Sequence, residues 1–218
     1  MKGCIVNKMR DLIIVGAGNA AREVLQIVKD INKVRLSWNI IGFIADTGVD
    51  IPALTNGKFE IIGSINDYHP KENEVFTCAI ADPVGRKYVI NLLRNRGAEF
   101  INVIHPSVML NDYCTLGEGI VMYPNSSIGP NASVGNYSLI QSSAIAHDVI
   151  IGEYSTISSL CGILGGVRIG RLVFIGCGAV LIPNIRIGDG AYIGAGSVVI
   201  KNVKDTKKVF GNPAKLID

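Results

Sequence analysis

The chain has 218 residues and a formal net charge of +3, with 48% hydrophobic and 18% charged residues. This balance predicts a globular protein with a core of its own and excludes an intrinsically disordered chain. The Lys and Arg residues are scattered, with no basic run denser than KDTKK at 204–208, so nucleic acid is not expected to be the main partner.

The cysteines indicate a reducing environment. They lie at positions 4, 78, 114, 161 and 177, and no two of them form a C-x-x-C motif. Neither a disulfide framework nor a zinc site is expected from this pattern, and each cysteine is predicted to be a small buried residue. The start, MKGCIVNKMR, lacks the apolar region of a signal peptide, and no window approaches 18 unbroken apolar residues. A cytoplasmic protein without a membrane span is therefore expected.

Residues 11–100 alternate between strand-like and helix-like patterns. Helices are predicted from the glycine turn at 16 to about 31, and from Pro83 to about Arg96. Strands or extended segments are predicted at 11–15, 39–46, 59–64, 74–82 and 99–106. This alternation predicts a small parallel sheet with helices on its faces, in a first domain over residues 1–102.

From residue 104 the pattern changes to a repeat of six residues. Ile, Leu, Val or Met occupies every sixth position, at 104, 110, 116, 122, 128, 134 and 140, and then at 145, 151, 157, 163, 169, 175, 181, 187, 193 and 199. Each hexad can supply one short strand and one corner, and three hexads close a triangular coil with the aliphatic residue inside. A second domain over residues 103–218 is therefore predicted to be a parallel β-helix of about five to six coils.

Glycine often follows these aliphatic positions directly, as in Ile128-Gly and Ile151-Gly. Such a glycine is expected at a corner, because it tolerates positive φ and close packing. The only break in the rhythm is the step of five from Ile140 to Ile145. A shortened step moves a corner and can redirect a side chain outward, and His147 follows two residues after Ile145.

His147 is the candidate catalytic residue, because histidine is well suited to proton transfer near neutral pH. Asp148 either orients its ring, as a carboxylate does in a triad, or faces the interior or a neighbouring subunit. His69 and His105 each precede a proline. Both are expected to be surface residues with a single hydrogen bond.

The turn GAGNAARE at 16–23 follows a buried strand and opens a helix. Its backbone N–H groups and the positive end of the helix dipole can hold a phosphate, although G-x-G alone is a weak signal for a dinucleotide. Asp46 is either a ligand-binding residue or a turn residue at the end of its strand. Arg86 lies near the start of the second helix and is expected to be exposed to solvent.

The order of these motifs resembles one bacterial family over almost the whole chain. Those motifs are G-A-G at a strand–helix turn, A-x-D-P, I-H-P-S at the junction, hexapeptide repeats with an H-D pair, and G-N-P-A-K near the end. They resemble the hexapeptide-repeat sugar O-acyltransferases of the sialic acid O-acetyltransferase type. That family includes N-acetyltransferases for nucleotide-linked 4-amino-4,6-dideoxy sugars, and its β-helix is left-handed.

The resemblance implies a reaction and a set of site residues. His147 is the general base, Asp148 assists it, and acetyl-CoA lies in a groove between subunits of a trimer, with the N–H of Gly165 on the thioester carbonyl. The residues expected to bind the cofactor are Gly165, Gly166 and Thr156, and some family members have a second histidine in place of Thr156. The first domain is a Rossmann-like nucleotide-sugar-binding domain, with Gly16, Gly18, Asn19, Asp46, Ile80, Ala81 and Asp82 at its site.

The resemblance therefore implies acetyl-CoA-dependent acetylation of the amine of a nucleotide-linked amino sugar, in surface polysaccharide biosynthesis. One alternative is O-acetylation of sialic acid or a related sugar by the same fold. A second is a zinc enzyme of the carbonic anhydrase kind, which needs about three converging histidines, whereas His147 alone lies within the repeat core. A third is a non-enzymatic scaffold or nucleotide sensor.

Overall fold

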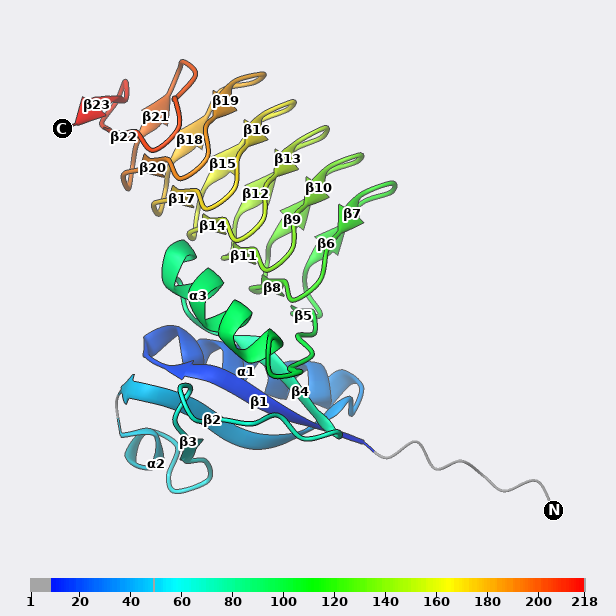
Figure 1. Ribbon diagram of the computed structural model, residues 1–218. Coiled ribbons are helices and arrows are strands. Elements are labelled where there is room, and N and C mark those ends of the chain that lie inside the picture. The colour runs from blue at the N-terminus through cyan, green and yellow to red at the C-terminus, as the bar shows by residue number, and fades with distance from the viewer. Residues whose placement is uncertain (1–8, 49, 218) are drawn as a thin grey trace.

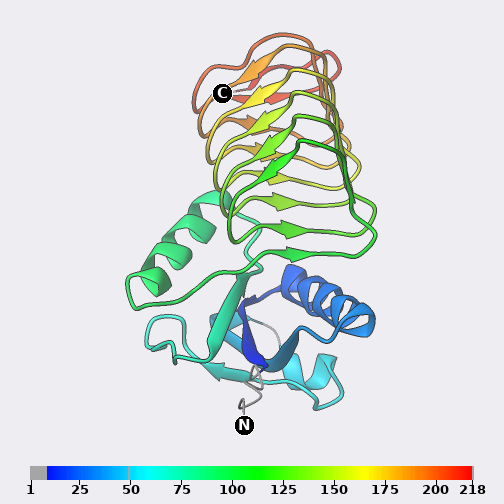
Figure 2. The same cartoon turned by 90° about the vertical axis from the view of Figure 1, so that its right-hand side faces the viewer.

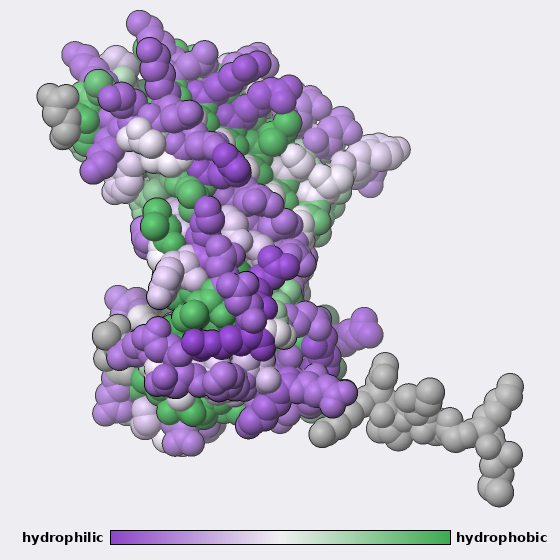
Figure 3. Space-filling model, viewed as in Figure 1, coloured by the Kyte–Doolittle hydropathy of each residue, from purple (hydrophilic) through white to green (hydrophobic). Residues whose placement is uncertain are grey.

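The computed structural model describes residues 9–48 and 50–217, in an N-terminal α/β domain below a β-solenoid (Figure 1). Cys4, predicted to be buried, lies outside the described residues. The two domains are joined end to end, and the molecule narrows between them (Figure 3). Among the described residues, no helix is long and apolar enough to cross a membrane.

The N-terminal domain contains the predicted parallel sheet. Its strands are β1 (Arg10–Ala17), β2 (Trp38–Gly48), β3 (Ile61–Gly63) and β4 (Glu74–Cys78), in the order β3-β2-β1-β4. Burial of Leu12–Ala17 in β1 explains the unbroken apolar character of this strand, since helices cover both faces of a parallel sheet. Every residue of β4 is buried as well, including the polar Glu74 and Thr77. The strand predicted at 74–82 ends at Cys78, and the chain then turns away.

Two predicted helices are confirmed and one short helix was not predicted. Helix α1 (Asn19–Val34) buries Val24, Ile27 and Val28 against the sheet, as its apolar spacing predicts. Helix α3 (Pro83–Arg94) begins where proline fits the first turn, and the Asp82 side chain accepts a hydrogen bond from the N–H of Gly85. Helix α2 (Ile51–Leu54) has only four residues, too few for a periodic signal.

The solenoid is triangular in cross-section, with a sheet on each side (Figure 2). The first side, here the long sheet, contains β5 (Val103–Ile104), β8 (Val121–Met122), β11 (Leu139–Ile140), β14 (Thr156–Ile157), β17 (Phe174–Ile175), β20 (Tyr192–Ile193), β22 (Lys208–Phe210) and the antiparallel β23 (Lys215–Ile217). The six-stranded sheet contains β6 (Met109–Leu110), β9 (Ser127–Ile128), β12 (Ala144–Ile145), β15 (Gly162–Ile163), β18 (Val180–Leu181) and β21 (Val198–Val199). The five-stranded sheet contains β7 (Thr115–Leu116), β10 (Ser133–Val134), β13 (Ile150–Ile151), β16 (Arg168–Ile169) and β19 (Arg186–Ile187).

The predicted aliphatic positions form the solenoid core. From Met122 to Val199 each one is buried and stacks on its equivalent in the next coil, for example Ile145 on Ile163. Leu110 is an exception, because β6 is the last strand of its sheet and Leu110 is 45% exposed. A second buried column lies two residues before each aliphatic position and contains small or apolar residues such as Ser155 and Val167. Sequence analysis did not identify this column.

For the glycines that follow the aliphatic positions, the prediction of close packing is confirmed and the prediction of positive φ was wrong. They do not have positive φ; a side chain there would collide with the next coil, since a Cβ on Gly152 would lie 2.5 Å from the carbonyl carbon of Gly170. Positive φ occurs instead three residues after the aliphatic position, at residues such as Tyr154, Asp148 and Asn184. Close approach between coils, rather than left-handed backbone, therefore requires glycine.

The cysteines are less uniform than predicted. Cys78 and Cys161 are buried and Cys114 is half-buried, but Cys177 is exposed at a turn of the solenoid. All four are free thiols. The prediction of burial was therefore wrong for Cys177, because a corner position of the repeat points to solvent whatever residue occupies it.

A continuous series of aromatic rings joins the two domains. Tyr68, Phe76, Phe100, Tyr137 and Tyr154 are neighbours in that order, with centroid distances of 6.0, 5.9, 6.2 and 5.0 Å. The first three belong to the N-terminal domain and its exit, and the last two to solenoid corners. Packing of this kind fixes the orientation of the solenoid on the N-terminal domain.

Candidate functional site

His147 lies on the corner of the solenoid that joins the six-stranded to the five-stranded sheet. The part of this edge from His147 to the last coil, here the histidine corner, consists of the turns at 146–149, 164–167, 182–185 and 200–202, and the turns at 111–114 and 129–132 precede it. The rungs Ile145, Ile163, Leu181 and Val199 stack in register directly before these turns. The residues two positions later therefore form a column along the corner: His147, Gly165, Pro183 and Lys201.

The imidazole of His147 is held by its neighbour in the sequence. Its Nδ1 lies 2.7 Å from Oδ2 of Asp148, and both side chains are more than half exposed. The hydrogen bond from His147 lowers the pKa of Asp148 below its ordinary value, with a smaller contribution from Asn131. A carboxylate on Nδ1 favours the tautomer with the proton on Nδ1, which leaves the Nε2 lone pair available. Asp148 thus orients the ring and does not face the interior.

Gly165 gives the ring its space. A Cβ at this position would lie 2.6 Å from both Cε1 and Nε2 of His147, closer than any real contact. The N–H of Gly165 donates to no acceptor within residues 9–48 and 50–217, whereas that of Gly166 donates to the carbonyl of His147. Nε2 of His147, for which the described residues offer no hydrogen-bond partner, therefore lies close to Gly165. Gly166 has φ +71°, and a Cβ there would meet Asn184 at 2.4 Å.

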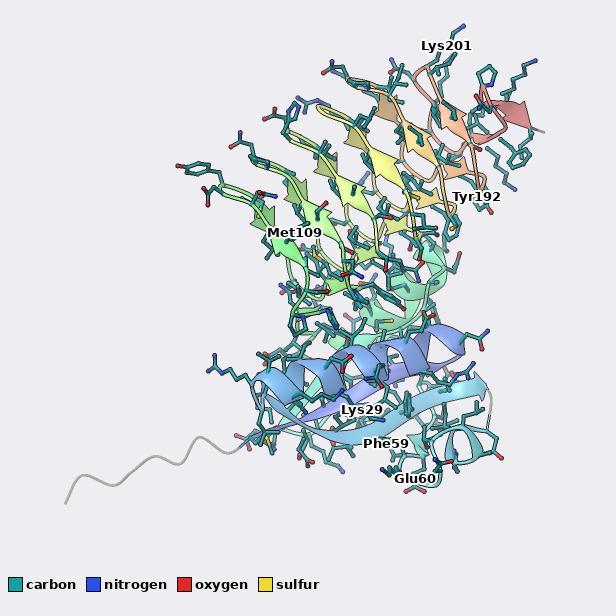
Figure 4. The ribbon with its side chains drawn as sticks, turned by 180° about the vertical axis from the view of Figure 1, so that it is seen from behind. Lys29, Phe59, Glu60, Met109, Tyr192 and Lys201 are labelled. Atoms are coloured by element: carbon teal, nitrogen blue, oxygen red, sulfur yellow. The ribbon has the colours of Figure 1, made fainter. Side chains whose placement is uncertain are left out.

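The column above His147 leads to a basic end of the solenoid. Lys201 projects from the end farthest from the N-terminal domain, whereas Met109 lies in the lowest coils (Figure 4). A hollow of about 390 Å³ opens there, lined by Lys201, Lys204 and Lys207 among others. Three coil spacings separate His147 from Lys201, which is about 14 Å at the usual distance between strands.

The shortened step of the repeat does not itself turn His147 outward. The missing residue falls in the turn at 141–143, which joins the long sheet to the six-stranded sheet, one corner before His147. Ser142 has φ 34° there, whereas Leu160 in the next coil has φ 62°. The step from Ile145 to Ile151 is regular. The proposed link between the break and the histidine was therefore wrong, and the space at Gly165 explains the orientation of the ring.

A second candidate site lies in the N-terminal domain, at the carboxyl ends of its parallel strands. A cavity of about 540 Å³, here the strand-end cavity, is lined by Gly16, Gly18, Asn19, Asp46, Ile80 and Ala81 together with Ala17, Ala20, Ala45, Ile65, Ala79 and Val89. Six of the seven residues predicted to bind substrate therefore lie together. Ligands of open parallel sheets usually bind at this edge.

The entrance to α1 is open to a ligand. Gly16 has φ +101°, a value that favours glycine, and Gly18 caps α1 without any side-chain hydrogen bond. No acidic residue occupies the first turn of α1. The N–H groups of this turn and the helix dipole are therefore directed at the cavity.

Two polar side chains of the cavity lining, Asp46 and Asn19, are held by neighbouring side chains. Asp46 accepts hydrogen bonds from the Ser64 hydroxyl and, at 2.9 Å, from the Asn66 amide. Arg22 donates to Oδ1 of Asn19 at 2.7 Å, while its Nε is buried without a partner among the described residues. Sequence analysis did not single out Arg22, although it lies in the quoted stretch GAGNAARE, because an arginine on a helix carries no pattern of its own.

Asp82 does not lie with the other predicted substrate-binding residues, and Thr156 does not lie with the other predicted cofactor-binding residues. Asp82 does not line the strand-end cavity, and its carboxylate caps α3. Thr156 lies on the long sheet, fully buried, and donates to the carbonyl of Ala81 at 2.7 Å. It is therefore next to the strand-end cavity rather than to Gly165 and Gly166, a placement that argues against the expected contact with a cofactor.

The other two histidines and Arg86 of α3 lie outside both candidate sites. His69 is exposed, as predicted. The prediction was wrong for His105, whose side chain is only 17% exposed and whose Nδ1 lies 2.8 Å from the Ser107 hydroxyl and accepts a hydrogen bond from the Ser107 N–H, while its Nε2 lies 3.7 Å from Oδ2 of Asp30. Arg86, predicted to be exposed, is only 2% exposed and donates to four backbone carbonyls. Among the described residues, no three His, Cys, Asp or Glu side chains gather as metal ligands.

The two candidate sites face different directions in one chain. The strand-end cavity is next to the long sheet, through the contact of Ala81 with Thr156. The histidine corner joins the other two sheets and so lies on the edge opposite the long sheet.

The sequence and the fold resemble known proteins in both halves. Residues 11–93 match the PglD N-terminal domain family, and residues 166–201 match the bacterial transferase hexapeptide family. GDP-perosamine N-acetyltransferase of Escherichia coli O157:H7 is 34% identical over 172 residues, which cover 77% of this chain and 76% of that protein.

Two solved structures share the fold over almost the whole chain. The acetyltransferase domain of PglB from Neisseria gonorrhoeae FA1090, in complex with acetyl coenzyme A, has a TM-score of 0.83 at 23% identity, covering 96% of this chain and 100% of that one. PerB from Caulobacter crescentus, in complex with CoA and GDP-perosamine, has a TM-score of 0.78 at 23% identity, covering 95% and 97%.

Proposed function

Because the chain belongs to the family of hexapeptide-repeat sugar acetyltransferases that includes GDP-perosamine N-acetyltransferase, we propose that it transfers the acetyl group of acetyl-CoA to the amine of a nucleotide-linked amino sugar. The observation that supports this reaction most directly is the pair at the histidine corner. Nδ1 of His147 is bound by Asp148 at 2.7 Å, and Nε2 lies next to Gly165.

The chemistry at the histidine corner requires only a base and an oxyanion donor. A thioester is already activated, so an acceptor amine can attack it directly without an acyl-enzyme. Nε2 of His147 takes the proton that the attacking amine loses, and Asp148 stabilises the resulting imidazolium. When the tetrahedral intermediate collapses, the carbon–sulfur bond breaks and the imidazolium returns this proton to the departing CoA thiolate. The N–H of Gly165, which donates to no acceptor among the described residues, stabilises the negative charge on the thioester oxygen.

The donor lies along the column His147–Lys201 in this proposal. Glycines at 165 and 166 let its acyl end approach the backbone, and the lysines at 201, 204 and 207 balance the charge of its phosphates. The acceptor occupies the strand-end cavity, with its diphosphate at the start of α1 and at Arg22. Asp46, held by Ser64 and Asn66, is positioned for a ribose or base.

A trimer would bring the two sites together. The outward row of the six-stranded sheet is small or apolar, at Met109, Ser127, Ala144, Gly162, Val180 and Val198. Such a flat surface suits packing against a second copy, whereas the five-stranded sheet presents Arg168 and Arg186. In a closed ring, the histidine corner of one protomer faces the strand-end cavity of its neighbour. We place this enzyme in the cytoplasm, where acetyl-CoA is available, in the biosynthesis of a surface polysaccharide.

The test is an acetyl transfer assay with GDP-, UDP- and dTDP-linked 4-amino sugars as acceptors, beginning with GDP-perosamine. Release of CoA thiol measures the rate, and mass spectrometry of the product distinguishes an amide from an ester. We expect N-acetylation of at least one nucleotide-linked amino sugar. Turnover of free sialic acid alone, with ester formation, would replace this proposal with O-acetylation.

A further inference from the structure

Arg86 is a buried cation whose hydrogen bonds all go to backbone oxygens. It is 2% exposed, and desolvation by burial lowers its pKa to about 10, so it remains protonated at neutral pH. Its guanidinium donates four hydrogen bonds between 2.7 and 3.0 Å. A buried charge is costly unless its donors are satisfied, so this arrangement requires all four carbonyls to stay in place.

The four carbonyls belong to both domains. Two of them, those of Ile80 and Ala81, lie on the wall of the strand-end cavity at 2.7 and 3.0 Å from Nη1. The other two, those of Tyr137 and Tyr154, lie on successive corners of the solenoid at 2.8 and 2.7 Å. One planar side chain thus joins the wall of the cavity to two coils, a geometry that suits the fork of arginine and not lysine.

Thr156 makes a second connection to the same wall. Its side chain is fully buried, and its hydroxyl donates to the carbonyl of Ala81 at 2.7 Å. Strand β4 ends at Cys78, so Ile80 and Ala81 lie beyond the sheet ladder, and their carbonyls are held by Arg86 and Thr156. The sheet holds this segment as far as Ala79, whose N–H donates to the carbonyl of Val15 at 2.9 Å, and the solenoid contributes to the position of the wall beyond it.

We propose that Arg86 and Thr156 are positioning residues that hold the Ile80–Ala81 wall of the acceptor site at a fixed height on the solenoid. This inference rests on the proposed function. Thr156 follows His147 in the same coil, so the wall is fixed to the coil that carries the base. Symmetry about an axis along the solenoid keeps equivalent coils at equal height. The wall then lies at the height of the base supplied by a neighbouring protomer.

Thr156→Val tests this inference, because valine keeps the shape of the side chain and removes only the hydroxyl. We expect KM for the nucleotide-linked amino sugar to rise about 3- to 10-fold, the effect of one lost hydrogen bond. KM for acetyl-CoA and the melting temperature should stay close to the wild-type values. Thr156→Ser restores the hydroxyl and should restore KM.

Ser155→Ala is the matched control. Ser155 is the adjacent residue, equally buried, but its hydroxyl donates within the solenoid, to the carbonyl of Gly170 at 2.8 Å. Its loss should leave KM for the acceptor unchanged. Arg86→Lys removes the fork and should raise KM for the acceptor by about tenfold or more, with loss of stability. If Arg86→Lys fails to fold, the acceptor KM of Thr156→Val still tests the positioning role.

The outcomes separate the two proposals. A wild-type enzyme that acetylates no nucleotide-linked amino sugar overturns the proposed function. An active wild-type enzyme with an unchanged acceptor KM in Thr156→Val overturns the positioning role, as does an equal rise in Ser155→Ala. A fall in kcat at constant KM also overturns it, because that result would place Thr156 in the chemical step. Titration calorimetry with GDP-perosamine, without acetyl-CoA, should reproduce the ratio of KM values.

Discussion

Gly165→Ala should inactivate the enzyme without unfolding it. The added Cβ would lie 2.6 Å from Cε1 and Nε2 of His147, while ordinary carbon contacts begin at 3.4 Å. The ring must therefore move by about 1 Å, and a displacement of that size can cost about 100-fold in rate. The ring is exposed and packs in no core, so the same displacement should change the free energy of unfolding by less than about 0.5 kcal/mol.

The assay is CoA thiol release at saturating acetyl-CoA, with the acceptor concentration varied. We expect kcat to fall by about 100-fold and KM for the acceptor to stay within about twofold, because the strand-end cavity is not altered. Thermal unfolding of the same preparations shows whether the fold is intact. A variant with more than half of the wild-type kcat would refute the assignment of His147, since its ring would then be free to leave its position without consequence.

Gly162→Ala is a suitable control for this experiment. Gly162 lies in the same coil, has no positive φ, and a Cβ there would meet nothing closer than Val180 at 3.9 Å. Ala144 occupies the equivalent position one coil below. Alanine is therefore compatible with this row, and activity should be retained. Equal losses in both variants would indicate a general effect on the solenoid and not on the ring.

Other variants test the base, the acceptor site and the core. His147→Ala should lower kcat by about 10²- to 10⁴-fold, and Asp148→Asn by about tenfold, with thiol release as the measurement and an unchanged acceptor KM as the check. Arg22→Met should raise KM for the nucleotide-linked sugar by about tenfold while kcat is preserved, because one charged hydrogen bond to a phosphate is lost; a fall in kcat alone would contradict this role. Burial raises the pKa of Cys78 from 9.0 to about 11, so between these values the unfolded state binds fewer protons. The free energy of unfolding should therefore fall with rising pH by up to about 1.4 kcal/mol per unit. Urea titrations at pH 8 and 10 should show a smaller fall in Cys78→Ala, and equal falls would exclude this origin.

The sequence predicted the repeat because each coil must present the same residue type to the same neighbour. Ile145, Ile163 and Leu181 follow this rule, and their stacking was readable from spacing alone. The strand-end cavity was likewise predictable, because Gly16, Gly18 and Asp46 follow strands whose carboxyl ends meet. The likeness of the motifs to a known family then related these positions to a reaction.

Contacts between distant segments were not predictable in this way. Arg86 is buried because solenoid carbonyls 51 and 68 residues later accept its hydrogen bonds, and nothing in its local sequence indicates this. Asp82 suits a cap as well as a ligand, and its proximity to Gly85 decides in favour of the cap. The orientation of His147 depends on Gly165 in the next coil, so the irregular spacing nearby had no part in it.

In the proposed donor site, the number of coils between His147 and Lys201 sets the distance between the base and the lysines. Each added coil would move the lysines away from the imidazole by about 4.8 Å, and each deleted coil would bring them closer by the same amount. The distance between the imidazole and the lysines is therefore set by the number of coils between them rather than by any single contact. Every acyl-CoA has the same pantetheine arm between its thioester and its phosphates, so in the proposed donor site a gained or lost coil would break either the contact at the imidazole or the contact at the lysines.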